Sequence, residues 1–258
     1  MRFGVVTLFP EAVVAALGVG VVGRALARGV VGLEVENPRD HATDVHRTVD
    51  DRPFGGGPGM VMTPGPLVAA TRAVRDRLGG APVVLLGPAG RRFDQATARR
   101  WSRADALVLI AGRYEGVDER VVDAVVDEEA SLGDFVLSGG EFAALAMIDA
   151  TARLVPGVLG RAASAEQDSF GEGSFGGAGG LDCPHWTRPE TFEGRSVPDV
   201  LLSGDHERIR RWRETEAASR TRARRPDLLR GGAGVAVDDQ RRTPEGGATR
   251  TTNGGETP

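Results

Sequence analysis

The sequence contains no lysine, and all 32 of its basic residues are arginine. Complete avoidance of lysine is typical of a coding bias, although arginine also suits bidentate contacts to phosphate. The single cysteine, Cys183, excludes an intrachain disulfide and fits a reducing compartment, so we expect a cytoplasmic protein. No apolar run reaches the roughly 18 residues of a membrane span, and the N-terminus has no signal-peptide pattern. We therefore expect no membrane partner.

The charge of the chain, −4 in total at pH 7, is distributed unevenly. Residues 115–134 are strongly acidic, whereas residues 206–230 carry a marked excess of arginine. Such an arginine-rich segment is typical either of a solvated helix face or of a contact to nucleic acid, and composition alone leaves both open. Residues 231–258 combine glycine and polar residues with almost nothing apolar, so we expect a disordered tail.

Apolar runs alternate with helical patterns over residues 1–160 and predict an α/β domain with a largely parallel sheet. Strands are expected at Phe3–Phe9, Gly32–Glu36, Val83–Leu86 and Ala106–Ala111, with a further fragment at Phe135–Leu137. Helices are expected at Glu11–Leu17, Gly23–Arg28, Thr63–Leu78, from a capping Asp94 to Ser102, and at Glu141–Leu154. Asp118–Val126 fits either a short helix or a strand.

The rest of the chain divides into a glycine-rich stretch, residues 161–180, and a region with helical patterns, residues 181–230. The glycine-rich stretch is predicted to be a mobile linker. The helical region is predicted to be a small, mostly helical second domain, in which Asp205 can cap a helix that carries Ile209 and Trp212.

Two patterns suggest chemistry that their surroundings do not support. Gly18 to Gly23 matches the dinucleotide fingerprint G-x-G-x-x-G, but that fingerprint needs a strand running directly into its first glycine, and here a helical stretch intervenes. A glycine break between two helices is favoured. Cys183 and His185 could begin a zinc site, but no second pair of ligands follows, so a structural role without metal is favoured.

Glycine-bearing loops are expected at the carboxyl ends of three strands, where open α/β sheets bind their ligands. These loops, Leu85–Pro88, Gly112–Gly116 and Ser131–Glu141, together predict one cleft lined by backbone groups. A further loop, Arg47–Met60, is dense in glycine and proline and carries Asp50 among arginines. It fits either a contact to a nucleotide or an internally salt-bridged connector, and its residues leave both open.

These loops resemble those of the bacterial tRNA (guanine-N1)-methyltransferases of the TrmD type, members of the SPOUT class of S-adenosylmethionine-dependent enzymes. The matching stretches are Arg47–Met60, Gly112–Arg120, Asp127–Glu141, Pro156–Gly160, Asp168–Phe170, Leu181–His185 and Arg210–Arg213. The chain departs from this family at Phe54 and Phe135, where tyrosines are expected, and in a linker extended within residues 171–180.

The resemblance implies a parallel-sheet SPOUT domain over residues 1–160, with a trefoil knot at its C-terminal part, and a tRNA-binding helical domain over residues 181–230. It also implies a homodimer whose site is built across the interface, and tRNA rather than DNA as partner. The adenine of the methyl donor would lie against Leu132, Phe135 and Leu137. The full donor pocket would comprise Leu86, Gly87, Pro88, Gly112, Arg113, Tyr114, Glu115, Gly116, Leu132, Gly133, Asp134, Phe135, Val136, Leu137, Ser138, Gly139 and Gly140.

Methyl transfer to N1 of guanine needs a base that removes the N1 proton and a cation near O6. The resemblance assigns these roles to Asp168 and Arg153, which by themselves would be read as a solvated linker acid and an ordinary charge at a helix C-terminus. It also implies that Glu115 assists the reaction through a Mg²⁺ ion, although the sequence itself shows no magnesium site. Asp50 would read the guanine edge, and tRNA phosphates would be held by Arg210, Arg211, Arg213, Arg220, Arg224 and Arg225.

Three other functions remain as alternatives. A SPOUT enzyme acting on a ribose or a ribosomal base would lack the Asp168-Ser169-Phe170 match. A nicotinamide-dependent oxidoreductase would use Gly18–Gly23, and binding of NADH rather than S-adenosylmethionine would identify it. A catalytically silent RNA-binding protein would not need Arg153 and Asp168, which this chain retains.

Overall fold

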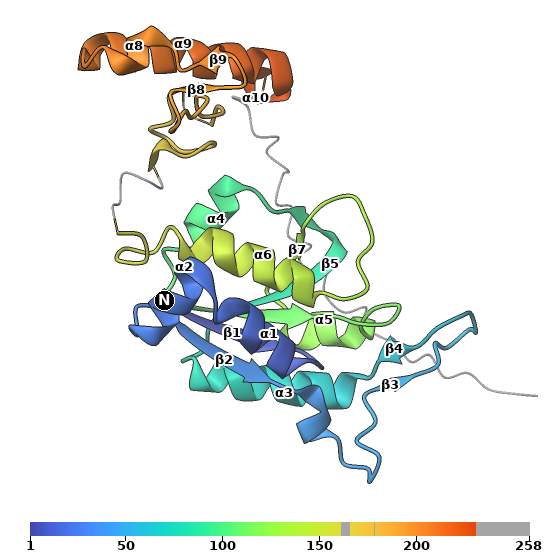
Figure 1. Ribbon diagram of the computed structural model, residues 1–258. Helices are drawn as coiled ribbons and strands as arrows, with labels where there is room; N and C mark the ends of the chain where they lie inside the picture. Colours follow the sequence, from blue (N-terminus) through green and yellow to red (C-terminus); the bar gives the residue numbers. More distant parts are fainter. Residues whose placement is uncertain (161–165, 178, 231–258) are drawn as a thin grey trace, which may run out of the picture.

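The computed structural model describes residues 1–160, 166–177 and 179–230. Its centre is a five-stranded sheet in the order β2-β1-β6-β5-β7, with every neighbouring pair parallel (Figure 1). The predicted α/β class with a parallel sheet is thus confirmed. The strands are β1 (Arg2–Val6), β2 (Gly32–Glu36), β5 (Val83–Arg92), β6 (Ala106–Ala111) and β7 (Glu128–Ser131).

Helices cover both faces of this sheet, because alternate strand residues point to opposite sides. On one face, Phe3 and Val5 pack with α1 (Pro10–Leu17), α2 (Gly20–Ala27), α4 (Gln95–Trp101) and α6 (Glu141–Ala152). On the other, Val6 and Ile110 pack with α3 (Pro64–Arg77) and α5 (Glu119–Val125). Asp118–Val126, which fitted either element, therefore forms the helix α5.

Smaller elements complete the described chain. A 3-10 helix, η1, spans Pro38–His41, and β3 (Asp50–Asp51) and β4 (Val61–Met62) form an antiparallel hairpin. Figure 1 places a C-terminal group of elements beyond one end of the sheet layers. It consists of the hairpin of β8 (Thr191–Phe192) and β9 (Arg195–Ser196) and the helices α8 (Asp199–Leu202), α9 (His206–Arg224) and α10 (Asp227–Arg230). Asp205 caps α9 as predicted, by accepting from the N–H groups of Glu207 and Arg208.

The predicted strand fragment at Phe135–Leu137 is wrong. The fifth strand is β7, just before it, and Phe135, Val136 and Leu137 lie in a loop with 56%, 91% and 37% of their surfaces exposed. β7 is an edge strand of sequence Glu-Glu-Ala-Ser and has no apolar alternation to reveal it. The predicted disordered tail, residues 231–258, lies outside the described residues.

Strand β5 also differs from its prediction, since it continues to Arg92 instead of ending near Leu86. Its pairing with β7 shifts register between Leu86 and Arg91. Pro88 lies within this irregular stretch, and because proline has no N–H to donate, it is tolerated where the ladder is interrupted. Gly87 and Pro88 therefore leave the sheet at a bulge rather than at a strand end.

The break between the two helices is shorter than the glycine fingerprint: only Gly18 and Val19 separate α1 from α2, and Gly20 to Gly23 lie in the first turn of α2 instead of preceding the helix. Gly18 caps the end of α1 by donating to the Val14 carbonyl, and α2 begins at Gly20. No single described helix is long and apolar enough to cross a membrane. α1 and α2 satisfy that criterion only together, and they are bent by 95° relative to each other.

The cap of α4 provides a test of the local folding rules. The Asp94 carboxylate accepts from the Thr97 N–H at 2.8 Å. Asp94→Ala should lower the free energy of unfolding by about 1 kcal/mol, whereas Asp94→Asn keeps an acceptor and should retain most of it. Urea unfolding measures both. Equal losses in the two variants would mean that the cap does not stabilise α4.

Candidate active site

A cavity of about 520 Å³ opens beside the bulge of β5 and the loops that follow β6 and β7. The predicted donor residues that line it are Leu86, Gly87, Pro88, Gly112, Arg113, Tyr114, Glu115, Gly116, Leu132, Gly133, Phe135, Val136, Leu137, Ser138, Gly139 and Gly140. Asp134 does not line it, because its side chain is 94% exposed and lies 3.8 Å from Arg92. The structure therefore gathers the three glycine-bearing segments at one cavity, although Gly87 and Pro88 reach it from the bulge within β5 and not from a strand end as predicted.

Sequence reasoning missed the floor of this cavity. The additional lining residues include Val122 and Ala143, which belong to α5 and α6. These are apolar residues of regular elements that otherwise form the core, so no local pattern distinguishes them from other core positions. Only the packing of α5 and α6 against the loops brings them to the cavity.

The loops after β6 and before α6 touch backbone to backbone. The Gly140 N–H donates to the Gly112 carbonyl at 2.8 Å. A Cβ on Gly140 would lie 2.8 Å from the Ala111 Cα and 2.9 Å from the Gly112 nitrogen, closer than real Cβ atoms approach. Tyr114 adopts a left-handed conformation with φ 61°, a strained state for a non-glycine residue that clusters at functional sites. The cavity wall therefore needs glycine at position 140.

A buried ionic network holds these loops to the sheet. Glu141, at the start of α6, lies with Oε2 3.1 Å from the Arg113 Nε and accepts from the Thr7 hydroxyl at 2.7 Å. Arg113 also donates to the Ser138 carbonyl at 2.7 Å, and its guanidinium lies 4.3 Å from the centre of the Phe9 ring. The Glu141 side chain is only 7% exposed, so the pair with Arg113 is needed to offset the cost of burying its charge.

The β3–β4 hairpin is attached to the same cavity wall. The Glu115 N–H donates to the Met60 carbonyl at 3.0 Å, and Gly59, with φ +77°, leaves space that the Glu115 side chain occupies. Burial raises the pKa of Tyr114, and the neighbouring Asp50 raises it further, so the phenol stays protonated at neutral pH. The hairpin thus places Asp50 beside a residue of the cavity.

The two predicted catalytic residues contact each other, but they do so outside the 520 Å³ cavity. An Nη of Arg153 donates to the Asp168 carboxylate at 2.5 Å, and both residues line a smaller cavity of about 220 Å³. Their side chains are 42% and 52% exposed. Neither residue lines the 520 Å³ cavity of the same chain. A single chain therefore brings acid and cation together without placing them at the predicted donor pocket.

The arginines predicted to hold phosphate fall into two groups. Arg210 pairs with Glu207 and Glu214, Arg211 pairs with Glu207, and Arg225 pairs with Asp227. No ion pair of Arg213, Arg220 or Arg224 is found within the described parts of the chain. Exposed pairs of this kind contribute at most about 1 kcal/mol, so a phosphate can displace their carboxylates.

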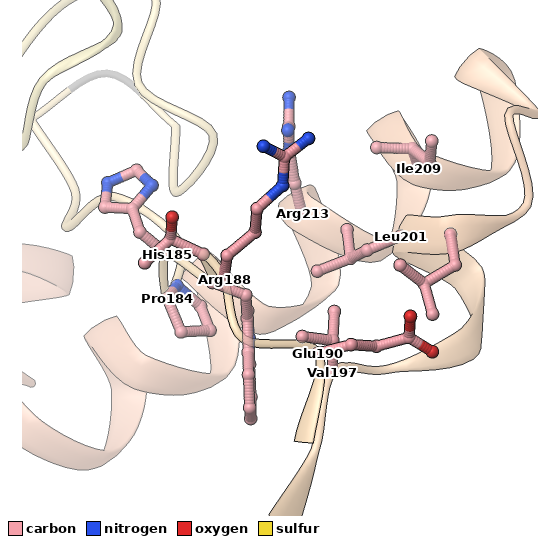
Figure 2. Close-up of a pocket in the computed structure, with 11 residues that line it drawn as sticks. Pro184, His185, Arg188, Glu190, Val197, Leu201, Ile209 and Arg213 are labelled. Carbon is pink, nitrogen blue, oxygen red and sulfur yellow. The ribbon is translucent and has the colours of Figure 1, made fainter. Parts of the chain in front are cut away.

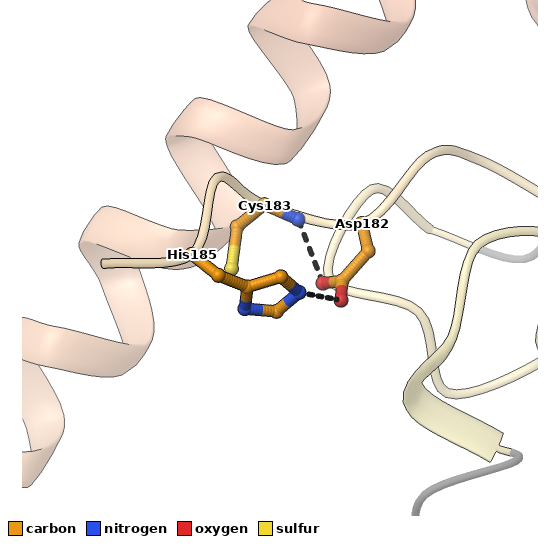
Figure 3. A group of neighbouring side chains, drawn as sticks. All are labelled: Asp182, Cys183 and His185. Carbon is orange, nitrogen blue, oxygen red and sulfur yellow. Dashed lines mark hydrogen bonds and ion pairs between the residues drawn. The ribbon is translucent and has the colours of Figure 1, made fainter. Parts of the chain in front are cut away.

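One group of side chains found in the described chain could hold a metal ion, because its donor atoms all lie within 4.8 Å of one another. It consists of Asp182, Cys183 and His185 (Figure 3). The Asp182 carboxylate is already engaged, accepting from the Cys183 N–H at 2.7 Å and lying 3.1 Å from the His185 Nε2. Burial raises the pKa of the Cys183 thiol, and Asp182 raises it further. A protonated thiol and an occupied carboxylate favour the structural role predicted for this segment.

A parallel α/β sheet with glycine loops around a cavity at its carboxyl edge defines a ligand-binding α/β enzyme domain. Residues 1–231 match the family model described as tRNA (Guanine-1)-methyltransferase TrmD. The chain belongs to this family, which confirms the resemblance inferred from its loops.

Curated relatives agree with the family assignment. The chain is 56% identical over 240 residues to the tRNA (guanine-N(1)-)-methyltransferase of Chromohalobacter salexigens, covering 90% of this chain and 88% of the relative. It is 59% identical over 230 residues to that of Methylococcus capsulatus, covering 89% of each. Similarity to the Shewanella denitrificans protein, 53% over 244 residues, covers 94% of this chain and 95% of the relative.

Substitution of Gly140 tests whether the loop contact forms the donor pocket. Gly140→Ala places a Cβ against the backbone of Ala111 and Gly112, so it should cost about 1–3 kcal/mol of stability and weaken binding of S-adenosylmethionine. Isothermal titration calorimetry and thermal unfolding measure the two effects.

A matched control is Gly65→Ala, because a Cβ at Gly65 in α3 meets no atom within 4 Å. This variant should bind the methyl donor like the parent, and any loss of stability should be confined to the first turn of α3, where Pro66 follows the new Cβ. Unchanged donor binding in Gly140→Ala would place the donor pocket elsewhere.

Proposed function

We propose that this protein transfers a methyl group from S-adenosylmethionine to N1 of the guanine immediately 3′ of the anticodon in tRNA, position 37. Membership of the TrmD family over residues 1–231 supports this activity. The observation that carries its mechanism is the contact between Arg153 and Asp168, 15 positions apart in the sequence. This contact places the Arg153 guanidinium, a hydrogen-bond donor, beside the Asp168 carboxylate, which can accept a hydrogen bond and take up a proton.

The Watson–Crick edge of guanine presents the complementary order of groups. Its O6 accepts a hydrogen bond, and the adjacent N1–H donates one. In the proposed complex, Arg153 donates to O6 and the Asp168 carboxylate accepts from N1–H. As the bond from the methyl carbon to N1 forms, the sulfur–methyl bond of the donor would break and leave a neutral thioether. Asp168 takes the N1 proton, and the negative charge that develops on O6 is stabilised by the Arg153 guanidinium. Without this base, neutral guanine has no lone pair in the ring plane at N1.

The 520 Å³ cavity fits the methyl donor in size and in the character of its walls. Leu132, Phe135 and Leu137 offer an apolar surface for the adenine, while the methionine part would meet Glu115 and the backbone near Gly140. At Gly140 the backbone of Ala111 and Gly112 occupies the space that a Cβ would need, so glycine lets these two loops of the cavity wall pack closely together. When bound, S-adenosylmethionine supplies an electrophilic methyl group; the protein residues bind it and exclude water.

A homodimer would reconcile the two separate cavities. Because Arg153 and Asp168 line one cavity and the donor loops line another, we propose that the pair from one copy acts at the donor cavity of a second copy. The proposal further includes the trefoil knot, the linker at residues 161–180 and a separate helical tRNA-binding domain at residues 181–230. It also includes a location in the cytoplasm. Within the linker, residues 161–165 and 178 lie outside the described residues.

The one group of three potential metal ligands found among the described residues contains the Cys183 thiol, whereas Mg²⁺ prefers oxygen ligands. A Mg²⁺ ion is usually held by only one or two carboxylates together with water and substrate, so Glu115 would be its protein ligand in the proposed complex. Such an ion would add positive charge near the reacting groups, while Asp168 and Arg153 keep their proposed roles.

Substitutions of the pair test the mechanism. Asp168→Asn keeps the size and hydrogen bonding of the side chain but removes its basicity, so turnover should fall about 10²–10⁴-fold. Arg153→Ala should cost about 10²–10³-fold. Because both groups act in one transition state, the double variant should lose less than the product of the single losses. Single-turnover assays at saturating methyl donor, with nucleoside analysis for 1-methylguanosine, measure these rates.

The control is Glu172→Gln, another acid-to-amide change in the segment that carries Asp168, where Glu172 pairs with Arg99 at 3.3 Å. It should methylate like the parent. Unchanged binding of S-adenosylmethionine and unchanged melting exclude structural damage in the Asp168 and Arg153 variants. A rate close to that of the parent in Asp168→Asn would mean that another group, such as Glu115 or Asp50, is the base.

A further inference from the structure

A third cavity, of about 390 Å³, lies in the C-terminal group of elements, outside the sites described above (Figure 2). We call it the C-terminal cavity. The segment that follows Cys183 forms one wall, and the β9–α8 region and α9 form the other. Its lining residues are Pro184, His185, Trp186, Thr187, Arg188, Glu190, Val197, Leu201, Leu202, Ile209 and Arg213.

The walls combine an apolar surface with an aromatic ring. Val197, Leu201 and Ile209 form the apolar side, and Figure 2 shows Leu201 and Ile209 projecting from neighbouring helical segments. Trp186 lines the same cavity, and 45% of its surface is exposed. An exposed indole beside an apolar wall is a surface on which a planar ring can stack.

Two guanidinium groups add positive charge to this cavity. The Arg188 and Arg213 side chains extend from it in the same direction in Figure 2. Within the described residues, neither is joined to a carboxylate by an ion pair, in contrast to Arg210 and Arg211 on the same helix α9 as Arg213. Two arginines without such partners at one site favour an anionic group, and the fork of a guanidinium matches phosphate.

Glu190 restricts which anionic ligand fits. Glu190 lines the cavity together with Val197 (Figure 2), and its carboxylate would repel any anionic group placed next to it, so the anionic part of the ligand is expected at Arg188 and Arg213 instead. An exocyclic amino group of a nucleobase would instead donate to it. A ring that stacks, a phosphate and an amino group are together the features of a nucleotide.

We propose that the C-terminal cavity binds one unstacked nucleotide of the RNA substrate. Its base stacks on Trp186, its phosphate lies between Arg188 and Arg213, and Glu190 accepts from its amino group. This inference rests on the proposed function, because tRNA is the RNA concerned. It adds a base-contacting site to α9, on which Arg210, Arg211, Arg220 and Arg224 would contact the backbone phosphates alone.

The test measures equilibrium binding of a fluorescently labelled, unmodified tRNA transcript to the full chain over a series of salt concentrations. Trp186→Ala should raise the Kd for tRNA about tenfold, because one stacked base is lost. The salt dependence of Kd should not change in this variant. Arg188→Gln and Arg213→Gln should each raise Kd and reduce the slope of log Kd against log salt by about one.

Conservative and matched variants separate stacking from damage to the fold. Trp186→Phe keeps an aromatic ring and should recover most of the affinity. Arg208→Gln removes an exposed arginine of α9 that does not line the cavity, and it should leave Kd close to that of the parent. All variants should keep the parent's melting temperature and its Kd for S-adenosylmethionine.

The proposal is overturned if Trp186→Ala binds tRNA like Arg208→Gln, if Trp186→Phe fails to recover affinity, or if the arginine variants keep the parent's salt slope. Failure of the proposed function has a different signature. A parent protein that binds tRNA but forms no 1-methylguanosine would refute the methyl transfer, while the Kd values would still decide whether this cavity holds a nucleotide.

Discussion

The hydrogen bond from the Gly140 N–H to the Gly112 carbonyl is the contact on which the candidate donor cavity depends. It joins the loop after β6 to the start of α6, with no side chain between them. The Arg113–Glu141 pair lies directly beside this contact and connects it to Thr7 at the end of β1. One backbone contact and one buried ionic network therefore fix the cavity wall to the centre of the sheet.

Charge outside the core is arranged for a large polyanionic substrate. Arg210, Arg211 and Arg225 are held in exposed ion pairs, which cost little to exchange for phosphate. Arg188 and Arg213 instead flank an apolar cavity, where a base and its phosphate can be bound together. The Arg153–Asp168 pair matches the edge of guanine. In the proposed complex, positioning of the substrate, contact with a base and the methyl transfer itself therefore fall to separate groups of residues, as a substrate the size of tRNA allows.

Much of the fold could be predicted because its signals are local. The strand at Ala106–Ala111 is a continuous apolar run and matches β6, and the caps at Asp94 and Asp205 lie where predicted. The prediction failed at Phe135–Leu137, where apolar residues lie in an exposed loop, and at β7, a polar edge strand. In both cases tertiary contacts, rather than periodicity, decide the conformation.

The amino-acid sequence by itself determined the class of fold and the glycine loops, because these depend on local patterns of residue types. Its resemblance to a known family supplied the candidate methyl donor, base and cation. Only the tertiary structure decided which of these residues meet. It brought Arg153 to Asp168, separated that pair from the donor cavity of its own chain, and placed Trp186 with Arg188 and Arg213 around the C-terminal cavity. These contacts depend on packing between elements that are distant in sequence, and no local pattern encodes them.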